Sequence, residues 1–438
     1  MNINYRPEID GLRAIAVISV IFYHANVVIF DEKLFKGGFI GVDIFFVISG
    51  YLITSLILRE LNTTQSFSFI NFYQRRVRRI LLPLFFVMLL CFPVAWVHLD
   101  PGNFIDFSKS ILYSIGFSSN FYFWDMGQQY AAANSLLKPF LHTWSLSIEE
   151  QYYIIFPIFL FIIFRYLRNY LLLFLIVSFI FSILLADWGS KNYPSATFYF
   201  LHSRAWELIA GSFLAFSEIY QHYKKNNLII QNSLSFIGFF IILFSIIFGK
   251  THFPHPSFYT LAPVLGVCLV ILFSNKNTFL AKILSTKFFV GTGLISYSLY
   301  LWHYPIFAFA RINELDPGNI LNFLILIIPI IILSILTYFF IEKPSRNRET
   351  KFKIILSSIF LLLIIIITLN LLVINKDGFK KRMPPLLQGI NFNTPPWKLL
   401  KNDNNEICHN KKDGCVFNAS SKKKSFYDWR QSFCRINV

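Results

Sequence analysis

Two ionisable residues, Arg13 and His24, lie in the first apolar segment of the chain with ten residues between them. On a helix, a rise of about 1.5 Å per residue separates them by roughly 16 Å along the axis, about half the thickness of a hydrocarbon core. Either group costs several kcal/mol at mid-bilayer unless it faces protein or water. A snorkelling arginine and a hydrogen-bonded interior histidine would be a structural explanation. We favour a functional pair.

The composition of the chain indicates what must position this pair. Of its 438 residues, 55% are hydrophobic, 18% aromatic and only 14% charged, and the mean hydropathy is +0.54. These values are typical of a polytopic membrane protein. The formal charge of +17 comes mostly from basic residues in short loops between apolar segments, as positive-inside topology requires. We therefore expect membrane lipids, and no nucleic acid, as partners.

Apolar length and loop charge predict an all-α membrane protein of about eleven transmembrane helices, with the N-terminus in the cytoplasm and the C-terminus outside. No cleavable signal peptide is expected, because residues 6–13 carry acids as well as bases. The expected spans are 13–30, 39–58, 80–98, 148–165, 170–187, 204–220, 228–249, 258–274, 289–310, 320–342 and 353–374.

One apolar segment, 104–124, breaks this alternation. Counted as a full span, it would put the later basic loops on the wrong side of the membrane. Irregular or partial crossings are tolerated where the backbone is buried in protein or lines a cavity. Its several serines and Asn120 fit such surroundings better than lipid. We therefore predict one re-entrant or interfacial segment.

Five motifs, in their order and spacing, carry a resemblance to a known family. They lie at residues 5–17, 41–54, 72–83, 142–152 and 296–305. Over roughly residues 1–345 the chain resembles the acyltransferase-3 family of membrane O-acyltransferases. The resemblance implies transfer of an acyl group, usually acetyl from cytoplasmic acetyl-CoA, to a hydroxyl of a cell-envelope glycan such as O-antigen or peptidoglycan. It also implies that no metal is required, and a site in the bacterial inner (cytoplasmic) membrane.

For this chemistry, His24 is the expected general base, since imidazole titrates near neutral pH. Asp43 opens the second span on the side where the first ends, so we expect it to orient His24, as carboxylates do in hydrolase triads. The alternative for Asp43 is a carboxylate favoured at a helix start. Glu149 and Glu150 begin another span on that side; we expect one as a helix cap and the other as a second residue for orienting a base.

The basic cluster after the second span is the expected donor site. Guanidinium groups bind phosphates through paired hydrogen bonds, which suits CoA. Positive-inside topology and contact with lipid headgroups explain any single arginine about equally well. Arg13 would reach the pantetheine or diphosphate portion deeper in the bundle. The four arginines are Arg75, Arg76, Arg78 and Arg79.

Weaker signals surround the acceptor side. His303 lies among aromatic residues including Tyr297. The simpler interpretation of this group is an aromatic belt at the membrane interface, and the second is a platform that binds the acceptor sugar. Trp144 and Ser145 are candidate substrate contacts, although a helix cap explains the serine more simply. His142 and Arg204 are two further polar residues suited to a cavity.

The chain divides into three expected parts, which are the membrane domain 1–345, an inner loop with an extra last helix 346–375, and a polar extracytoplasmic tail 376–438. Cys408 and Cys415 are close enough for a small disulfide loop, or are two free thiols. The tail resembles the start of the extracytoplasmic hydrolase-like (SGNH) domain that related chains carry, here truncated.

A frameshift is one hypothesis for this truncation. Residues 422–424 are three lysines, which an uninterrupted adenine run can encode, and residues 426–434 can be written with codons that give Gly-Asp-Ser-His one base later. The alternative to an acyltransferase is a transporter or flippase for a lipid-linked sugar or acyl donor. Paired broken helices in two halves would favour such a transporter, and no such symmetry is evident in the sequence.

Overall fold

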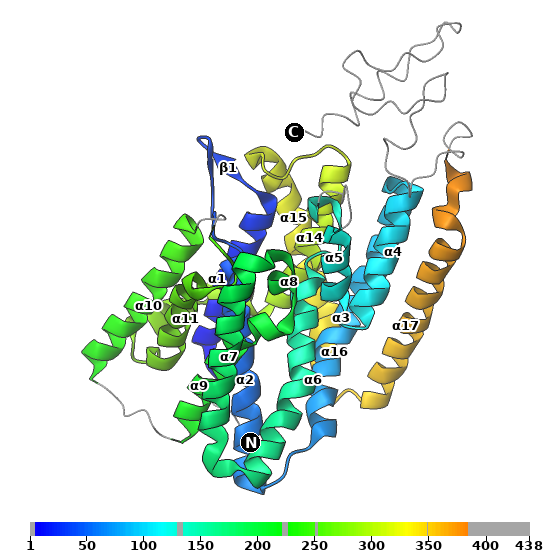
Figure 1. The fold of residues 1–438 in the computed structure, drawn as a ribbon. Helices are drawn as coiled ribbons and strands as arrows, with labels where there is room; N and C mark the ends of the chain where they lie inside the picture. The colour runs from blue at the N-terminus through cyan, green and yellow to red at the C-terminus, as the bar shows by residue number, and fades with distance from the viewer. Residues whose placement is uncertain (1–4, 129–134, 221–226, 250–252, 348, 384–438) are drawn as a thin grey trace, which may run out of the picture.

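The computed structural model describes residues 5–128, 135–220, 227–249, 253–347 and 349–383, and this part of the chain is almost entirely helical (Figure 1). The first half contains α1 (Pro7–Ala25), β1 (Val28–Ile29), β2 (Glu32–Lys33), α2 (Ile40–Thr64), α3 (Phe69–His98), α4 (Pro101–Ile115), α5 (Ser119–Gln128), η1 (Ser135–Leu137), α6 (Thr143–Tyr166), η2 (Arg168–Tyr170), α7 (Leu171–Asn192), α8 (Pro194–Tyr199) and α9 (Leu201–Ile219).

The second half contains α10 (Leu228–Phe248), η3 (Phe258–Thr260), α11 (Leu261–Phe273), α12 (Phe279–Leu284), α13 (Lys287–Leu294), α14 (Ser296–Ile312), α15 (Ile320–Thr337), the π-helical turn η4 (Tyr338–Glu342), α16 (Lys343–Arg346), α17 (Phe352–Asn375) and η5 (Asp377–Arg382). The two strands form only a short hairpin between α1 and α2. The predicted all-α polytopic membrane fold is confirmed.

Seven helical segments of the described residues are long and apolar enough to cross a membrane. They are Ile40–Thr64, Phe69–His98, Thr143–Tyr166, Arg168–Asn192, Leu228–Phe248, Ile320–Arg346 and Phe352–Asn375. The other four expected spans are helical too, but α11 has 13 residues, α14 has 17, and α1 and α9 carry buried charged residues. The total of eleven spans stays a prediction.

The segment expected to be re-entrant forms two helices rather than one. α4 has 15 residues, about 22 Å of helix, whereas a hydrocarbon core is about 30 Å thick. It ends at Gly116, and Phe117 then adopts a positive φ of 50° before α5 begins. Ser114, Ser119 and Asn120 of this region are buried in the protein. A partial crossing therefore stays a prediction that these lengths support.

α2 is the central helix of the bundle. Its most apolar window is 78% buried, against 22% for the windows of α15 and α17. α10 and α11 form one flank and α17 the opposite flank, beside α3 and α4 (Figure 1). The hairpin, the start of α4 and the end of α17 lie at one end of the molecule, and the α2–α3 connection lies at the other (Figure 1). Exposed apolar side chains on the flanks suit contact with lipid.

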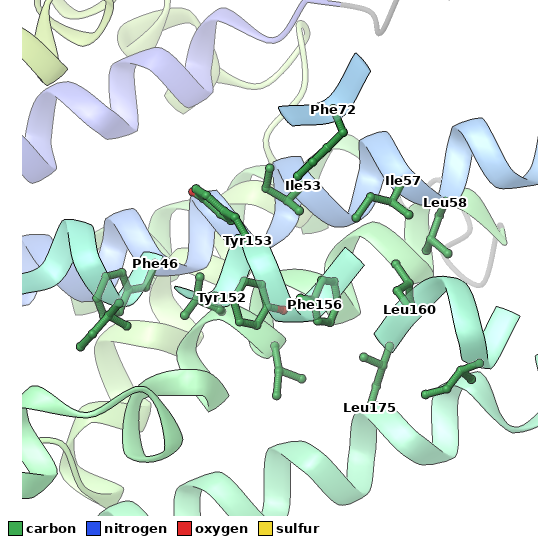
Figure 2. Packing of buried hydrophobic residues seen from close by; sticks show 14 of the residues in the cluster. Phe46, Ile53, Ile57, Leu58, Phe72, Tyr152, Tyr153, Phe156, Leu160 and Leu175 are labelled. Carbon is green, nitrogen blue, oxygen red and sulfur yellow. The ribbon is translucent and has the colours of Figure 1, made fainter. Parts of the chain in front are cut away.

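An aromatic and aliphatic core holds α2 against α3, α6 and α7. Phe46 and Ile57 of α2, Phe72 of α3, Tyr152 of α6 and Leu175 of α7 are all buried in one cluster (Figure 2). This packing matters for function because α2 and α6 also carry residues of the site described below.

α2 and α9 pack at glycine positions. A Cβ atom at Gly50 would lie 1.8 Å from the carbonyl oxygen of Leu208, and one at Gly211 would lie 2.0 Å from the carbonyl oxygen of Val47. Such close backbone approach through small residues is how helices associate in membranes, where van der Waals packing replaces the hydrophobic drive between helices. The sequence therefore permits the α2–α9 contact only while both positions remain glycine.

We expect Gly50→Ala to destabilise the protein by about 1–3 kcal/mol, because the added methyl group forces α2 and α9 apart. Thermal unfolding of the detergent-solubilised protein measures the effect. Gly291→Ala in α13 is the matched control, since nothing lies within 4 Å of a Cβ atom there. Equal unfolding temperatures for the two variants would contradict the close α2–α9 contact.

Residues 384–438 lie outside the described part of the chain, and with them Cys408, Cys415, the expected hydrolase-like start and the frameshift hypothesis.

Candidate active site

Three arginines gather around one cavity, called the arginine cavity below. Arg13 of α1 and Arg76 and Arg79 of α3 line it together with Glu149 of α6. The cavity is partly open, and the space between its atoms amounts to about 790 Å³ with the adjoining open solvent included. Apolar side chains of α2 form much of the remaining wall. Three guanidinium groups against one carboxylate suit an anionic ligand with an apolar or thioester portion.

The four arginines of the predicted donor cluster divide between two faces of α3. Arg76 and Arg79, three residues apart, share the face toward the cavity. Arg78 donates instead to the backbone carbonyls of Ser345, Asn347 and Thr350, at 2.9–3.2 Å. Arg75 lies 3.9 Å from Glu60.

The expectation that all four arginines form one site is therefore wrong. Arg75 and Arg78 do not line the arginine cavity, and Arg78 fastens the loop before α17.

Arg13 and Glu149 are both held inside the arginine cavity. Arg13 donates to Asp10 at 3.2 Å, and Glu149 accepts from Ser49 at 2.9 Å. The expectation that Glu149 or Glu150 orients a base near His24 is not met, because Glu149 faces the arginines. Glu150 is buried beside it and lines neither cavity.

A second cavity, called the histidine cavity below, has a different lining. His24 of α1, Arg204 of α9 and His255 of the α10–α11 connection line it. The rest of its wall is largely aromatic and serine-rich, formed by Tyr23, Phe39, Trp144, Ser190, Ser195, Phe198, Tyr199, Phe253 and Tyr300 among others. Aromatic faces beside hydroxyl and charged groups suit a polyhydroxylated ligand such as a sugar.

His24 pairs with another histidine. Its Nδ1 atom lies 3.0 Å from Nε2 of His303 on α14, and the two rings are nearly parallel. Arg311, also on α14, donates to the backbone carbonyl of His24. His303 is fully buried, so its interpretation as part of an interfacial aromatic belt is wrong.

Asp43 contacts Arg204 rather than His24. Its Oδ1 atom accepts from Nη1 of Arg204 at 2.9 Å, the same nitrogen donates to Glu207 at 3.0 Å, and all three side chains are at most 1% exposed. His255 lies 3.6 Å from the same Asp43 oxygen. The predicted His24–Asp43 contact is wrong, because the group that donates to this carboxylate is Arg204 of the distant helix α9.

The stability of the protein should depend on the buried Asp43–Arg204–Glu207 network. Arg204→Met should destabilise the protein by about 3–5 kcal/mol, because it leaves two carboxylates without their cation. Asp43→Asn should cost much less, since the Arg204–Glu207 pair remains. Thermal unfolding in detergent would rank the two variants, and an Asp43→Asn protein as unstable as Arg204→Met would contradict this account.

The two cavities share part of their walls. Val42 of α2 and Tyr300 of α14 line both. The Tyr300 hydroxyl donates to the backbone carbonyl of His142 at 2.6 Å and lies 2.6 Å from Oγ of Ser145, so it is held in place. The two cavities therefore adjoin at these two side chains, called the partition below.

The predicted substrate residues fall on both sides of this partition. Trp144 lines the histidine cavity, whereas Ser145 and Tyr297 line the arginine cavity. Tyr297 donates to the carbonyl of Ile80 at 2.9 Å, which ties α14 to α3. One role was expected of these residues from the sequence, but Trp144 and Ser145 are consecutive on α6 and point in directions about 100° apart.

His255 is a titratable cavity residue that sequence reasoning missed. It stands in a connection with no motif around it, and no spacing in the sequence relates it to Asp43. The described residues contain no group of three or more His, Cys, Asp or Glu side chains that could hold a metal ion.

Comparison with protein families gives a match over most of the chain. A family model described as "Acyltransferase domain" (Acyl_transf_3) matches residues 6–339. The chain belongs to this acyltransferase family. No solved structure matches it.

Three relatives are similar over most of the chain. The peptidoglycan O-acetyltransferase OatA of Listeria monocytogenes is 35% identical over 358 residues, which are 78% of this chain and 56% of the relative. "Putative O-acetyltransferase SAS0844" of Staphylococcus aureus is 36% identical over 362 residues, 79% and 58% of the two chains. "Putative peptidoglycan O-acetyltransferase YrhL" of Bacillus subtilis is 32% identical over 360 residues, 78% and 55%. The chain thus spans little more than half the length of these relatives.

Proposed function

We propose that this acyltransferase moves an acetyl group from acetyl-CoA in the arginine cavity to a hydroxyl of a cell-envelope glycan in the histidine cavity. The observation that carries the proposal is the pair of chemically different cavities that meet at Val42 and Tyr300. One suits a phosphorylated donor and the other a sugar, so a short acyl group is the part of the donor that must reach the partition.

The cavity arginines bind the negatively charged part of the donor. Arg76 and Arg79 bind CoA phosphates through charge-assisted hydrogen bonds, and Arg13 binds the deeper part of the donor. The apolar residues of α2 surround the pantetheine arm, whose thioester ends near Val42 and Tyr300. The arginines thus select a phosphorylated donor, and the apolar wall of α2 positions its thioester carbonyl.

The acceptor hydroxyl reacts at His24. Its proton goes to the imidazole, its oxygen forms a bond to the carbonyl carbon, and the carbon–sulfur bond breaks to release a thiolate. The imidazolium returns the proton to that thiolate, so free CoA and an acetyl ester leave. Trp144 and the other aromatic faces orient the sugar, with a peptidoglycan saccharide favoured over O-antigen by the names of two relatives.

The test of this function uses the purified full chain in detergent with acetyl-labelled acetyl-CoA and an N-acetylhexosamine tetrasaccharide. We expect alkali-labile acetyl ester on the saccharide, identified by a mass increase of one acetyl group. Release of label as free acetate alone, with no ester formed, would overturn the proposal. A parallel assay with the protein in sealed vesicles tests the transporter alternative, which passage of label across the membrane without ester would favour.

We also propose that the protein lies in the bacterial cytoplasmic (inner) membrane with its N-terminus in the cytoplasm. Phe30 in the hairpin is 96% exposed, and Gln65 between α2 and α3 is also exposed at the opposite end of the molecule. In a background without the five native cysteines, Phe30→Cys should react with an impermeant thiol reagent on intact cells, and Gln65→Cys only after permeabilisation. The reverse pattern would invert the proposed orientation.

A further inference from the structure

The contacts of His303 define which of its ring nitrogens carries hydrogen. Its Nδ1 atom lies 2.7 Å from the backbone carbonyl oxygen of Tyr300 and 3.2 Å from that of Leu299. A carbonyl oxygen only accepts hydrogen bonds, so Nδ1 of His303 must be the donor. In the neutral ring, Nε2 is then left with its lone pair.

The tautomer of His303 determines the tautomer of His24. Nε2 of His303 lies 3.0 Å from Nδ1 of His24, so the lone pair of His303 requires a hydrogen on Nδ1 of His24. The neutral His24 ring then has its own lone pair on Nε2. Since His24 lines the histidine cavity, this is the nitrogen that can take a proton from a bound hydroxyl.

We infer that His303 is a positioning residue for His24, which it holds in the Nδ1–H tautomer through the backbone of α14. The inference rests on the proposed transfer reaction. It assigns to His303 the orienting role that the sequence analysis expected of Asp43. When Nε2 of His24 accepts the acceptor proton, the Nδ1–H to Nε2 hydrogen bond becomes charge-assisted, and both rings share the positive charge. No further proton donor or acceptor is required.

The surroundings of His303 keep the ring in this position. The ring of Tyr304 packs nearly at right angles to both histidine rings, and the centroid of the His142 ring lies 5.5 Å from that of His303. Trp302 donates to Thr337 of α15 at 2.9 Å, which fixes the rotation of α14. A rigid neighbour is what an orienting residue needs, because a ring free to rotate would offer His24 either nitrogen.

Two variants of His303 separate hydrogen bonding from packing. His303→Gln keeps a side-chain carbonyl that can accept from Nδ1 of His24, whereas His303→Met has similar bulk and no such acceptor. We expect Met to lower kcat by up to ~100-fold with the KM for acetyl-CoA unchanged, and Gln to stay within ~10-fold of the native enzyme and clearly above the Met variant. Native kcat in the Met variant, or equal losses in both variants with intact folding, would overturn the inference.

A measurement on the unmodified chain covers the case in which the Met variant does not fold. Solid-state ¹⁵N NMR of the histidine-labelled protein in bilayers distinguishes the two neutral tautomers, and His24→Asn assigns the His24 signals by their loss. We expect hydrogen on Nδ1 of His24, and hydrogen on its Nε2 instead would overturn the inference. This readout needs no activity, so a failure of the proposed function leaves it interpretable.

Discussion

His24→Ala is expected to lower kcat for acetyl transfer by about 10²–10⁴-fold, the usual contribution of a general base, while membrane insertion and abundance stay near native. Its imidazole is the part-buried base that lines the histidine cavity and is held by His303. Single-turnover formation of the acetyl ester, normalised to purified protein, measures the effect. The loss should appear in the rate and not in the affinity for acetyl-CoA, whose proposed site is the other cavity.

Two comparison variants make this result decisive. His98→Ala changes an exposed histidine of α3 and should leave the rate unchanged. His255→Ala removes the other imidazole of the histidine cavity. If His24→Ala retained native turnover while His255→Ala lost it, His255 would be the base and the role given to His24 would be wrong.

Replacing both Arg76 and Arg79 by glutamine should raise the KM for acetyl-CoA by about 10²–10⁴-fold, because one hydrogen bond to a charged group is lost at each position. A hydrogen bond to a charged group is worth ~1.5–3 kcal/mol, and each ~1.4 kcal/mol is a factor of ten in affinity. Saturating donor should restore most of the turnover, since neither residue touches the reacting atoms. Initial rates across a range of acetyl-CoA concentrations measure both quantities.

The same helix supplies the control for this double variant. Arg75→Gln removes an arginine that does not line the arginine cavity, so the KM should stay near native. A KM increase in Arg75→Gln as large as that of the double variant would mean that the whole basic cluster attracts CoA through general charge. That result would contradict a specific donor site at Arg76 and Arg79.

Much of the fold could be predicted because a membrane restricts what a chain can do. Backbone groups in hydrocarbon must be satisfied within a helix, so each long apolar segment had to be helical. Segment 289–310 shows the limit, since it forms α13 and α14, which meet at Ile295. Hydropathy measures the length of an apolar run, and it does not register such a break.

The residues of the site could be selected from the sequence more readily than their pairing. Arg13, His24 and Asp43 stand out because charged groups in apolar segments are costly. Their partners are distant, however, since His303 is 279 residues from His24 and Arg204 is 161 residues from Asp43. The order of helices around the bundle decides these contacts, and no local pattern encodes that order.

The sequence likewise could not show which face of α3 meets the cavity. Arg75, Arg76, Arg78 and Arg79 cover more than one side of a helix at 3.6 residues per turn. Only the position of the loop before α17 separates Arg78, which binds that loop, from Arg76 and Arg79, which face the cavity.

The central claim is that donor and acceptor meet from opposite sides at the partition formed by Val42 and Tyr300. Its most direct test places the full chain in vesicles oriented with Gln65 outward, with labelled acetyl-CoA outside and the N-acetylhexosamine tetrasaccharide enclosed. The account predicts acetyl ester on the enclosed saccharide without leakage of acetyl-CoA into the vesicles. Ester formation only when both substrates are on the same side would contradict it.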